Sequence, residues 1–375
     1  MGRRGTRVRL HVVSNIPSPY NFHFFGDLSQ YLSLRVRYAA EPAAEGREWP
    51  LQLHPFELIE ANSIAEQREI MASRPDVVLI TGSYLGARSV MRRTVGRAAG
   101  RSLMFWGERL SANTLPSLAY RRRYFTGMSC ILAVGSAAAE SYRAVVGDQI
   151  PVHNFPYTTG VIETESRPAH TSDRETRREP ILGYVGSLTH RKGVDRIFRA
   201  LGQLRRDQRP RLQIIGEGPD RQQLTELAAH LEVAVEWFGF LDPAARASVQ
   251  RSWLAQVVPS RYDGWGVVVS EAMGLGIPII GSTAAGAVQD LVRTGWNGIQ
   301  VDSLEKLVEA ITLYSCHPET AHRHGLNAAA LGREVQSAKA AEWLAGVLVT
   351  PPSYPRSFVG DAWANVWRSD SFEQN

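Results

Sequence analysis

The stretch RYDGWGVVVSEAMGLGIPIIG, residues 261–281, places two carboxylates eight positions apart around a Gly-x-Gly turn. Gly264 and Gly266 let the backbone approach a ligand and turn into a helix without a Cβ in the way. The first amides of such a helix suit phosphate. Glu271, one turn inside, suits neutral hydroxyls such as those of a ribose, and Asp263 would reach another hydroxylated part of the ligand. The stretch therefore predicts a site for a phosphorylated, hydroxylated molecule; the alternative is a buried helix whose N-terminal acid stabilises the helix dipole.

The chain totals favour two ordinary domains in a globular α/β protein. There are 375 residues, of which 44% are hydrophobic and 21% are charged. No run of eighteen apolar residues occurs, so no membrane span is expected. The two cysteines, Cys130 and Cys316, have no metal-ligand spacing, which predicts a reduced, cytoplasmic protein without a metal site.

Positive charge is concentrated in the first half of the chain. Residues 1–160 carry 19 Arg against 12 acidic residues, net +7, and the remainder carries 23 basic against 25 acidic residues, net −2. Only three cations are lysines: Lys192, Lys306 and Lys339. A basic first half predicts an anionic neighbour for that half.

Apolar runs alternate with helical patterns along most of the chain, which predicts βα units and parallel sheets. The fold class we expect is α/β, with two Rossmann-like doubly wound domains and a ligand cleft between them. The expected strands are 8–13, 76–81, 102–106, 130–135, 181–186, 211–216, 235–240, 254–260, 278–282 and 298–301. One long helix is expected over 320–347.

The domain limits follow from changes in composition. Residues 1–160 form the first domain, and the polar, charged segment 161–179 is the linker. Residues 180–350 form the second domain. In the tail, 351–375, Trp363 and Trp367 are four positions apart, which predicts a short final helix packed on a domain surface.

Four segments of the second half resemble retaining glycosyltransferases of family four, which have two Rossmann-like domains in the GT-B fold. The spacing of Asp263 and Glu271 resembles the family's Glu-x7-Glu signature. The other matches, in chain order, are ILGYVGSLTHRKGVDRIFRAL (181–201), LQIIGEGPDRQQL (212–224) and STAAGAVQDLVRTGWNG (282–298). The first half resembles the family only in outline.

The resemblance implies transfer of a sugar from a nucleoside-diphosphate sugar to a saccharide or lipid-linked acceptor, with retention at the anomeric carbon, in bacterial glycan or polysaccharide biosynthesis. By position, Glu271 would hold the donor ribose and Asp263 the transferred sugar. Three positions depart from the family's pattern. Asp263 is one methylene shorter than the usual Glu, Ser187 replaces a common Arg, and Gln289 replaces a common acid. The remaining donor-binding residues would be Gly264, Trp265, Gly266, Val267, Ser187 and Glu217.

Two cations precede a predicted helix start at Gly193. Arg191 and Lys192 would neutralise a departing diphosphate, which supplies the electrostatic stabilisation that this reaction needs. The alternative is a solvated pair on a loop. With these cations in place we expect no metal, and no cofactor beyond the donor substrate.

Other candidates follow predicted strand ends. Phe240 is a stacking candidate for a nucleobase. In the first half, Asn15 and Tyr20 are candidate sugar ligands, with turn and cap chemistry as the alternative. Glu108, in FWGERL, is a candidate catalytic or sugar-contacting acid, and its neighbour Arg109 is a candidate acceptor contact.

An arginine patch is the candidate for contact with an anionic acceptor or the inner membrane surface. It would comprise Arg88, Arg92, Arg93, Arg97 and Arg101, together with YRRRYF at 120–125. A solvated helix face is the alternative, and nucleic acid is not expected as a partner.

Competing functions are a sugar-nucleotide epimerase of the same fold and a degenerate, non-catalytic sugar-nucleotide-binding protein. A dinucleotide-dependent dehydrogenase would need a Gly-x-Gly-x-x-Gly turn after a strand, and no turn here supplies it. A glycosidase would also use two carboxylates but has no use for phosphate-binding groups. The sequence names neither the base nor the sugar of a donor.

Overall fold

The computed structural model describes residues 7–41, 52–60, 62–82, 87–100, 102–110, 117–160, 180–350, 352 and 354–369. The chain divides into two units. The first contains Met1–Gly160 and Val335–Asp361, and the second contains Val161–Glu334 and Ala362–Asn375. The predicted linker, 161–179, lies outside the described residues.

A seven-stranded parallel sheet forms the centre of the first unit, in the order β3-β2-β1-β4-β5-β6-β7. The strands are β1 (Arg9–Ser14), β2 (Ser33–Tyr38), β3 (Glu57–Ile59), β4 (Val77–Thr81), β5 (Ser102–Gly107), β6 (Cys130–Ala133) and β7 (Val152–Asn154). Our sequence reasoning did not predict β2, β3 and β7. Apolar and polar residues alternate along β2, and Leu34, Val36 and Tyr38 are buried, so this strand carried a period-two signal that we overlooked. Strands β3 and β7 are three residues long, which is too short to show a periodicity.

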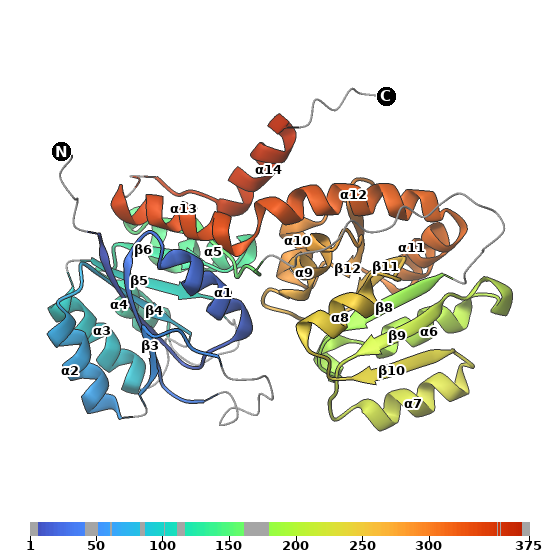
Figure 1. Cartoon of the computed structure of the whole chain (residues 1–375), viewed down its shortest axis with the longest axis horizontal. Coiled ribbons are helices and arrows are strands. Elements are labelled where there is room, and N and C mark those ends of the chain that lie inside the picture. The colour runs from blue at the N-terminus through green and yellow to red at the C-terminus, as the bar shows by residue number, and fades with distance from the viewer. Residues whose placement is uncertain are drawn as a thin grey trace. The chain divides into compact units, whose positions relative to one another are not determined.

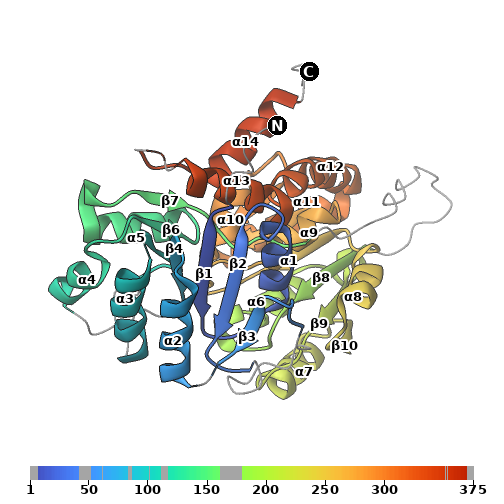
Figure 2. The same ribbon diagram turned by 60° about the vertical axis from the view of Figure 1, so that its left-hand side comes forward.

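Within the described residues, five α-helices lie between the strands of this sheet along the chain. They are α1 (Pro19–Leu28), α2 (Ser63–Ser73), α3 (Ala87–Ala99), α4 (Leu118–Phe125) and α5 (Ser136–Val146). Ser18 caps α1 by accepting a hydrogen bond from the amide of Asn21, and Pro19 occupies the first helical position. In Figure 1, α2 and α3 lie side by side along the strands, as they do from the second angle in Figure 2.

A buried ion pair joins α2 to α3. Glu66 is 0% exposed and receives hydrogen bonds from both Nε and Nη2 of Arg92, each at 2.9 Å. Arg88 also binds Glu66, and Arg93 donates to the carbonyls of Arg123 and Thr126 at the end of α4. The predicted surface patch is therefore wrong for Arg92, which is 1% exposed, because the fold neutralises its charge internally.

Arg88 and Arg93 also donate hydrogen bonds within the first unit, Arg88 to the carbonyl of Glu60 and Arg93 to the carbonyl of Tyr124. Part of the hydrogen-bonding capacity of both side chains is therefore used inside the unit. Arg101, the last member of the predicted patch, lies outside the described residues. Within the described parts of the chain, no helix is long and apolar enough to cross a membrane.

The second unit has a six-stranded parallel sheet in the order β10-β9-β8-β11-β12-β13. Its strands are β8 (Ile181–Val185), β9 (Arg211–Ile215), β10 (Val235–Gly239), β11 (Ala255–Val258), β12 (Ile279–Ser282) and β13 (Gly298–Val301). All six coincide with expected strands. Together the two parallel sheets confirm the predicted α/β class with two Rossmann-like domains.

Seven α-helices of the second unit lie in the described residues: α6 (Asp195–Gln203), α7 (Arg221–His230), α8 (Pro243–Gln250), α9 (Val268–Gly274), α10 (Gly286–Leu291), α11 (Leu304–Cys316) and α12 (Pro318–Glu334). Apolar side chains of α6 and α11 meet those of β8 and β9 in the core, for example Phe198, Ile311 and Ile214. Of the three valines in the opening stretch, Val269 in α9 is 0% exposed, whereas Val267 and Val268 are partly exposed.

The segment 320–347, predicted as a single helix, is two helices in the structure, and the chain passes from the second unit to the first between them. Gln336 is extended, with φ −76° and ψ 160°, and separates α12 from α13 (Ser337–Val349). Ser337 donates its amide hydrogen to Thr159 and its hydroxyl to Asp27, both in the first unit. Helix α13 then packs against α1 (Figure 1). The structure thus places 335–350 in the first unit, whereas we had assigned them to the second.

The expected tail helix is present as α14 (Phe358–Ser369). Trp363 of this helix contacts other residues of the second unit. Its indole Nε1 donates a hydrogen bond to the carbonyl of Asp290 at 3.0 Å, and the Arg293 guanidinium lies 4.3 Å from the centre of its ring. Trp363 is 6% exposed, whereas Trp367 remains 44% exposed. The burial expected for the two tryptophans therefore holds only for Trp363.

Candidate functional site

The order of strands in the second sheet reverses between β8 and β11. From β8 the chain builds outward to β9 and β10, and it returns on the other side at β11. Ligands of such sheets bind at the carboxyl ends of the strands flanking this reversal. Lys192 follows β8 and Asp263 follows β11. The fold therefore delivers the two predicted catalytic groups to the same edge of the sheet.

A tight turn after β8 holds the two predicted cations. Residues His190–Lys192 form one turn of 3₁₀ helix that ends at Gly193, where φ is +69°. A Cβ on Gly193 would lie 2.4 Å from the carbonyl oxygen of Pro259, so only glycine allows this close approach. The turn is thereby fixed against the chain that leads to Asp263.

Arg261 ties the same two segments together. Its guanidinium makes two hydrogen bonds of 2.7 Å to the Asp195 carboxylate and one of 2.9 Å to the carbonyl of His190. Burial alone would raise the pKa of Asp195, but the hydrogen bonds and charge of Arg261 outweigh it and hold that pKa below its ordinary value. A bidentate pair of this kind restrains both partners.

Asp263 lies between the two cations. Its Oδ2 is 2.5 Å from Lys192 Nζ, and its Oδ1 is 3.3 Å from Arg191 Nη1. The Asp263 side chain is 11% exposed and that of Lys192 is 18% exposed. One carboxylate faces two cations, so the cluster keeps a net positive charge. It is thus charged to receive a further anion such as a diphosphate.

The backbone on either side of Asp263 is also fixed. Its amide donates to the carbonyl of Ala284, and its carbonyl accepts from Gly286 at the start of α10. Gly266 has φ +97°, and a Cβ there would meet Asp263 Oδ2 at 3.2 Å. The Gly-x-Gly turn therefore leaves room for the aspartate in its position beside Lys192.

Among the other residues of this turn, Trp265 is 2% exposed. Its carbonyl accepts a hydrogen bond from the amide of Ala287 in α10, which ties the turn to that helix. Gly264 is buried and Val267 is partly exposed. The carbonyl of Val267 accepts from Ser270 Oγ within α9.

Glu271 is held by an arginine that we did not predict. Arg246 Nη2 in α8 lies 3.0 Å from Glu271 Oε1 in α9, and each side chain is 18% exposed. The structure does not bring Glu271 into contact with Lys192 or Arg191 among its hydrogen bonds and ion pairs. The two carboxylates of the opening stretch thus have separate cationic partners.

The turns after β8, β9 and β10 are connected. Leu188 donates its amide hydrogen to the carbonyl of Glu217, and Gly216 donates to Gly239 at 2.7 Å. Ser187 is exposed, and its carbonyl accepts from the Tyr184 hydroxyl. Phe240 is 59% exposed, so its ring is available for stacking. These predicted donor-binding residues share the carboxyl edge of the sheet with Lys192.

The candidate sugar-binding and acceptor-binding residues of the first unit also follow strand ends. Asn15 follows β1 and accepts a hydrogen bond from Arg92 at 3.4 Å. The ring of Tyr20 packs against that of Tyr157 in a tilted arrangement, with ring centres 5.0 Å apart. Glu108 and Arg109 follow β5 and are exposed. All lie after the carboxyl ends of strands, and Asn15 follows the strand at which the order of this sheet reverses.

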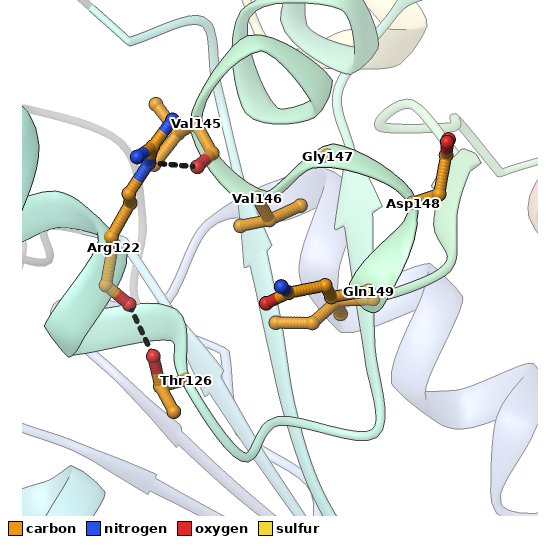
Figure 3. Close-up of a pocket in the computed structure, with 8 residues that line it drawn as sticks. Arg122, Thr126, Val145, Val146, Gly147, Asp148 and Gln149 are labelled. Atoms are coloured by element: carbon orange, nitrogen blue, oxygen red, sulfur yellow. Dashed lines mark hydrogen bonds between the residues drawn. The ribbon is translucent and has the colours of Figure 1, made fainter.

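The first unit also has a cavity of about 580 Å³, which none of these candidate residues lines (Figure 3). Arg122 and Thr126 at the end of α4 face residues 145–150 at the end of α5, and Arg122 Nε donates to the carbonyl of Val145. These helices end next to the starts of β6 and β7, at the amino edge of the sheet. The cavity is therefore at the opposite edge from Asn15 and Glu108.

Sequence reasoning missed Arg246, Arg261 and the role of Arg92. Only the position of Arg261 beside Asp263 offered a signal, since the other two stand in ordinary helical patterns. In the described residues there is no cluster of His, Cys, Asp and Glu able to hold a metal ion.

Solved structures of other proteins superpose on most of this chain. The Anabaena protein Alr3699/HepE in complex with UDP superposes with a TM-score of 0.71 at 15% identity, covering 92% of this chain and 100% of that one. The lipopolysaccharide outer core galactosyltransferase WaaB gives 0.68 at 15% identity, with the same coverage. The fold is therefore the GT-B fold that the resemblance of the four segments implied.

Residues 166–330 match the family model described as glycosyl transferases group 1. An alpha-D-kanosaminyltransferase from Streptomyces kanamyceticus is 32% identical over 192 residues, which are 49% of this chain and 50% of that protein. A GDP-mannose-dependent mannosyltransferase acting on monoacylated phosphatidylinositol monomannoside, from Corynebacterium glutamicum, is 25% identical over 249 residues, 61% of this chain and 62% of that one. The chain thus spans less than two thirds of these relatives.

Proposed function

We propose that this protein is a glycosyltransferase that moves a sugar from a nucleoside-diphosphate sugar to a saccharide or lipid-linked acceptor. The observation that carries the proposal is the Asp263 carboxylate facing Lys192 and Arg191 at the strand-order reversal. The cations suit the diphosphate, Glu271 suits the ribose, and Asp263 suits the sugar hydroxyls. The group 1 family match over residues 166–330 supports the same reaction.

We further propose that transfer proceeds with retention and without a metal, in the synthesis of a bacterial glycan. Retention rests on the resemblance of the Asp263-x7-Glu271 segment to retaining enzymes. The metal-free reaction rests on Lys192 and Arg191, which can neutralise the departing diphosphate themselves. Product stereochemistry by NMR, and activity in the presence of EDTA, would test the two parts separately. An epimerase would instead release an isomerised sugar nucleotide without acceptor.

The first test is nucleotide binding by Glu271→Gln. We expect the variant to bind the preferred nucleoside diphosphate about 1–3 kcal/mol more weakly than the parent, because a hydrogen bond to a charged acceptor becomes a neutral one. A calorimetric screen with UDP, GDP, ADP and TDP identifies the preferred nucleotide first. Unchanged affinity in Glu271→Gln would remove this residue from the site, and absence of binding by the parent would overturn the proposed function.

The second test concerns Lys192, whose charge should matter most when the diphosphate departs. Lys192→Ala should therefore lower kcat more than it raises the donor KM. Steady-state kinetics at saturating acceptor measure both constants, and Lys306→Ala, which breaks an exposed pair with Asp302, is the matched control. A rise in the donor KM with unchanged kcat would show that Lys192 contributes to donor binding but not to the chemical step.

A further inference from the structure

The arginine that holds Glu271 comes from a different helix than the glutamate itself. Arg246 belongs to α8, whose start is fixed by Asp242, because the Asp242 carboxylate accepts hydrogen bonds from the amides of Ala244 and Ala245. Pro243 occupies the first helical position and presets the backbone there. Arg246 follows directly, so its Cα is set by a well-capped first turn.

This contact fixes one oxygen of the Glu271 carboxylate and leaves the other available. Arg246 Nη2 is 3.0 Å from Oε1, and in the described part of the chain no hydrogen bond to Oε2 is present. An exposed glutamate samples several rotamers, whereas a glutamate held by a guanidinium keeps one. The pair therefore presents Oε2 in a defined direction as a hydrogen-bond acceptor.

The pair is poorly satisfied for one that only stabilises the fold. Arg246 Nε is buried, and it has no hydrogen-bond partner within the described residues. A buried donor without an acceptor destabilises the folded state. By contrast, the nearby pair of Arg261 and Asp195 uses two parallel hydrogen bonds of 2.7 Å. The geometry of Arg246 is better explained by the orientation of Glu271 than by stability.

We propose that Arg246 is the positioning residue that orients Glu271 toward the ribose hydroxyls of the donor, and that this contact gives the protein its preference for ribonucleotides. The proposal rests on the proposed function, because it assumes that the ligand is a nucleoside diphosphate. Arg246 acts through Glu271 and need not touch the ligand. Its effect should therefore appear in the discrimination between ribose and deoxyribose.

The experiment compares dissociation constants for UDP and 2′,3′-dideoxy-UDP, with GDP and its dideoxy analogue in parallel, by calorimetry. The proteins are the parent, Arg246→Gln, Arg246→Lys, Glu271→Gln and the double variant Arg246→Gln/Glu271→Gln. The control is Arg211→Gln, because Arg211 is an exposed arginine paired with Glu236 at the amino end of β9, away from the site. Melting temperatures establish that each variant is folded.

We expect the parent to bind the ribonucleotide at least tenfold more tightly than the dideoxy analogue. Arg246→Gln should reduce this ratio severalfold by weakening ribonucleotide binding, with little change for the analogue. Arg246→Lys, which keeps the charge, should recover part of the ratio. The double variant should resemble Glu271→Gln, because both substitutions remove one interaction. Arg211→Gln should keep the parent's ratio.

An unchanged ratio in folded Arg246→Gln would overturn the proposal and leave the pair as a link between α8 and α9. Equal weakening of both nucleotides would overturn it too, because Arg246 would then act on the phosphates or the base. A parent that binds nucleotides with a ratio of one would exclude the ribose role of Glu271, and with it this inference. Only a parent that binds no nucleotide would also overturn the proposed function.

Discussion

Asp263→Asn should lower sugar transfer by on the order of 10²–10³-fold, the usual effect of removing one preorganised polar contact from a reacting centre. Binding of the nucleoside diphosphate should persist and become slightly tighter. The reason is that Asp263 occupies Lys192 and Arg191 when no donor is bound, at 2.5 and 3.3 Å. A diphosphate competes with this carboxylate for the two cations, and the neutral amide of Asn would compete less well. Turnover kinetics and calorimetry measure the two effects.

Two results would contradict this assignment: full turnover in Asp263→Asn, or a large loss of nucleotide affinity. Asp263→Glu is the matched variant, because it keeps the charge and adds one methylene, roughly 1.5 Å of reach. It should keep the fold but change the order of preference among donor sugars, since a longer acid fills space that the aspartate leaves open. An unchanged donor order would show that Asp263 does not contact the transferred sugar.

Glu66→Gln should reduce the free energy of unfolding of the first unit by about 3–5 kcal/mol, the cost of leaving a buried charge without its partner. The charge left unpaired is that of Arg92, which is 1% exposed. Denaturant unfolding followed by circular dichroism measures the change. Glu69→Gln on the same helix is the control, because its ion pairs with Arg35 and Arg37 are partly solvated and should contribute about 1 kcal/mol or less.

The same pair predicts a dependence of stability on pH. Burial by itself would raise the pKa of Glu66, but the hydrogen bonds and charges of Arg92 and Arg88 outweigh it and hold that pKa below its ordinary value of 4.5. A group whose folded pKa is depressed stabilises the fold fully above its unfolded pKa and loses that contribution as the pH falls below it. The difference between parent and Glu66→Gln should therefore shrink below about pH 4.5. A constant difference at lower pH would contradict the ion-pair explanation.

The strands of the second unit could be predicted from the sequence because the signals that mark them are local. A Gly-x-Gly turn, a run of valines and an acid one helical turn later are read from neighbouring residues and appear directly in the sequence. The same holds for the strands of the second sheet, which are continuous apolar runs bounded by turn residues. In the first unit the short strands β3 and β7 lack such a signal. Strands β3 and β7 form because the neighbouring strands β2 and β6 supply backbone hydrogen-bond partners.

By itself the sequence determined the fold class, the strands that surround the candidate site and the residue types that the site contains. Only the tertiary structure decided which charges meet. It set Asp263 against Lys192, which is 71 positions away, paired Arg246 with Glu271, and buried Arg92 against Glu66 instead of leaving it in a surface patch. It also moved α13 to the first unit through the contacts of Ser337 with Thr159 and Asp27. The physical reason is that helix and strand patterns depend on neighbours along the chain, whereas ion pairs and domain assignment depend on contacts between distant segments.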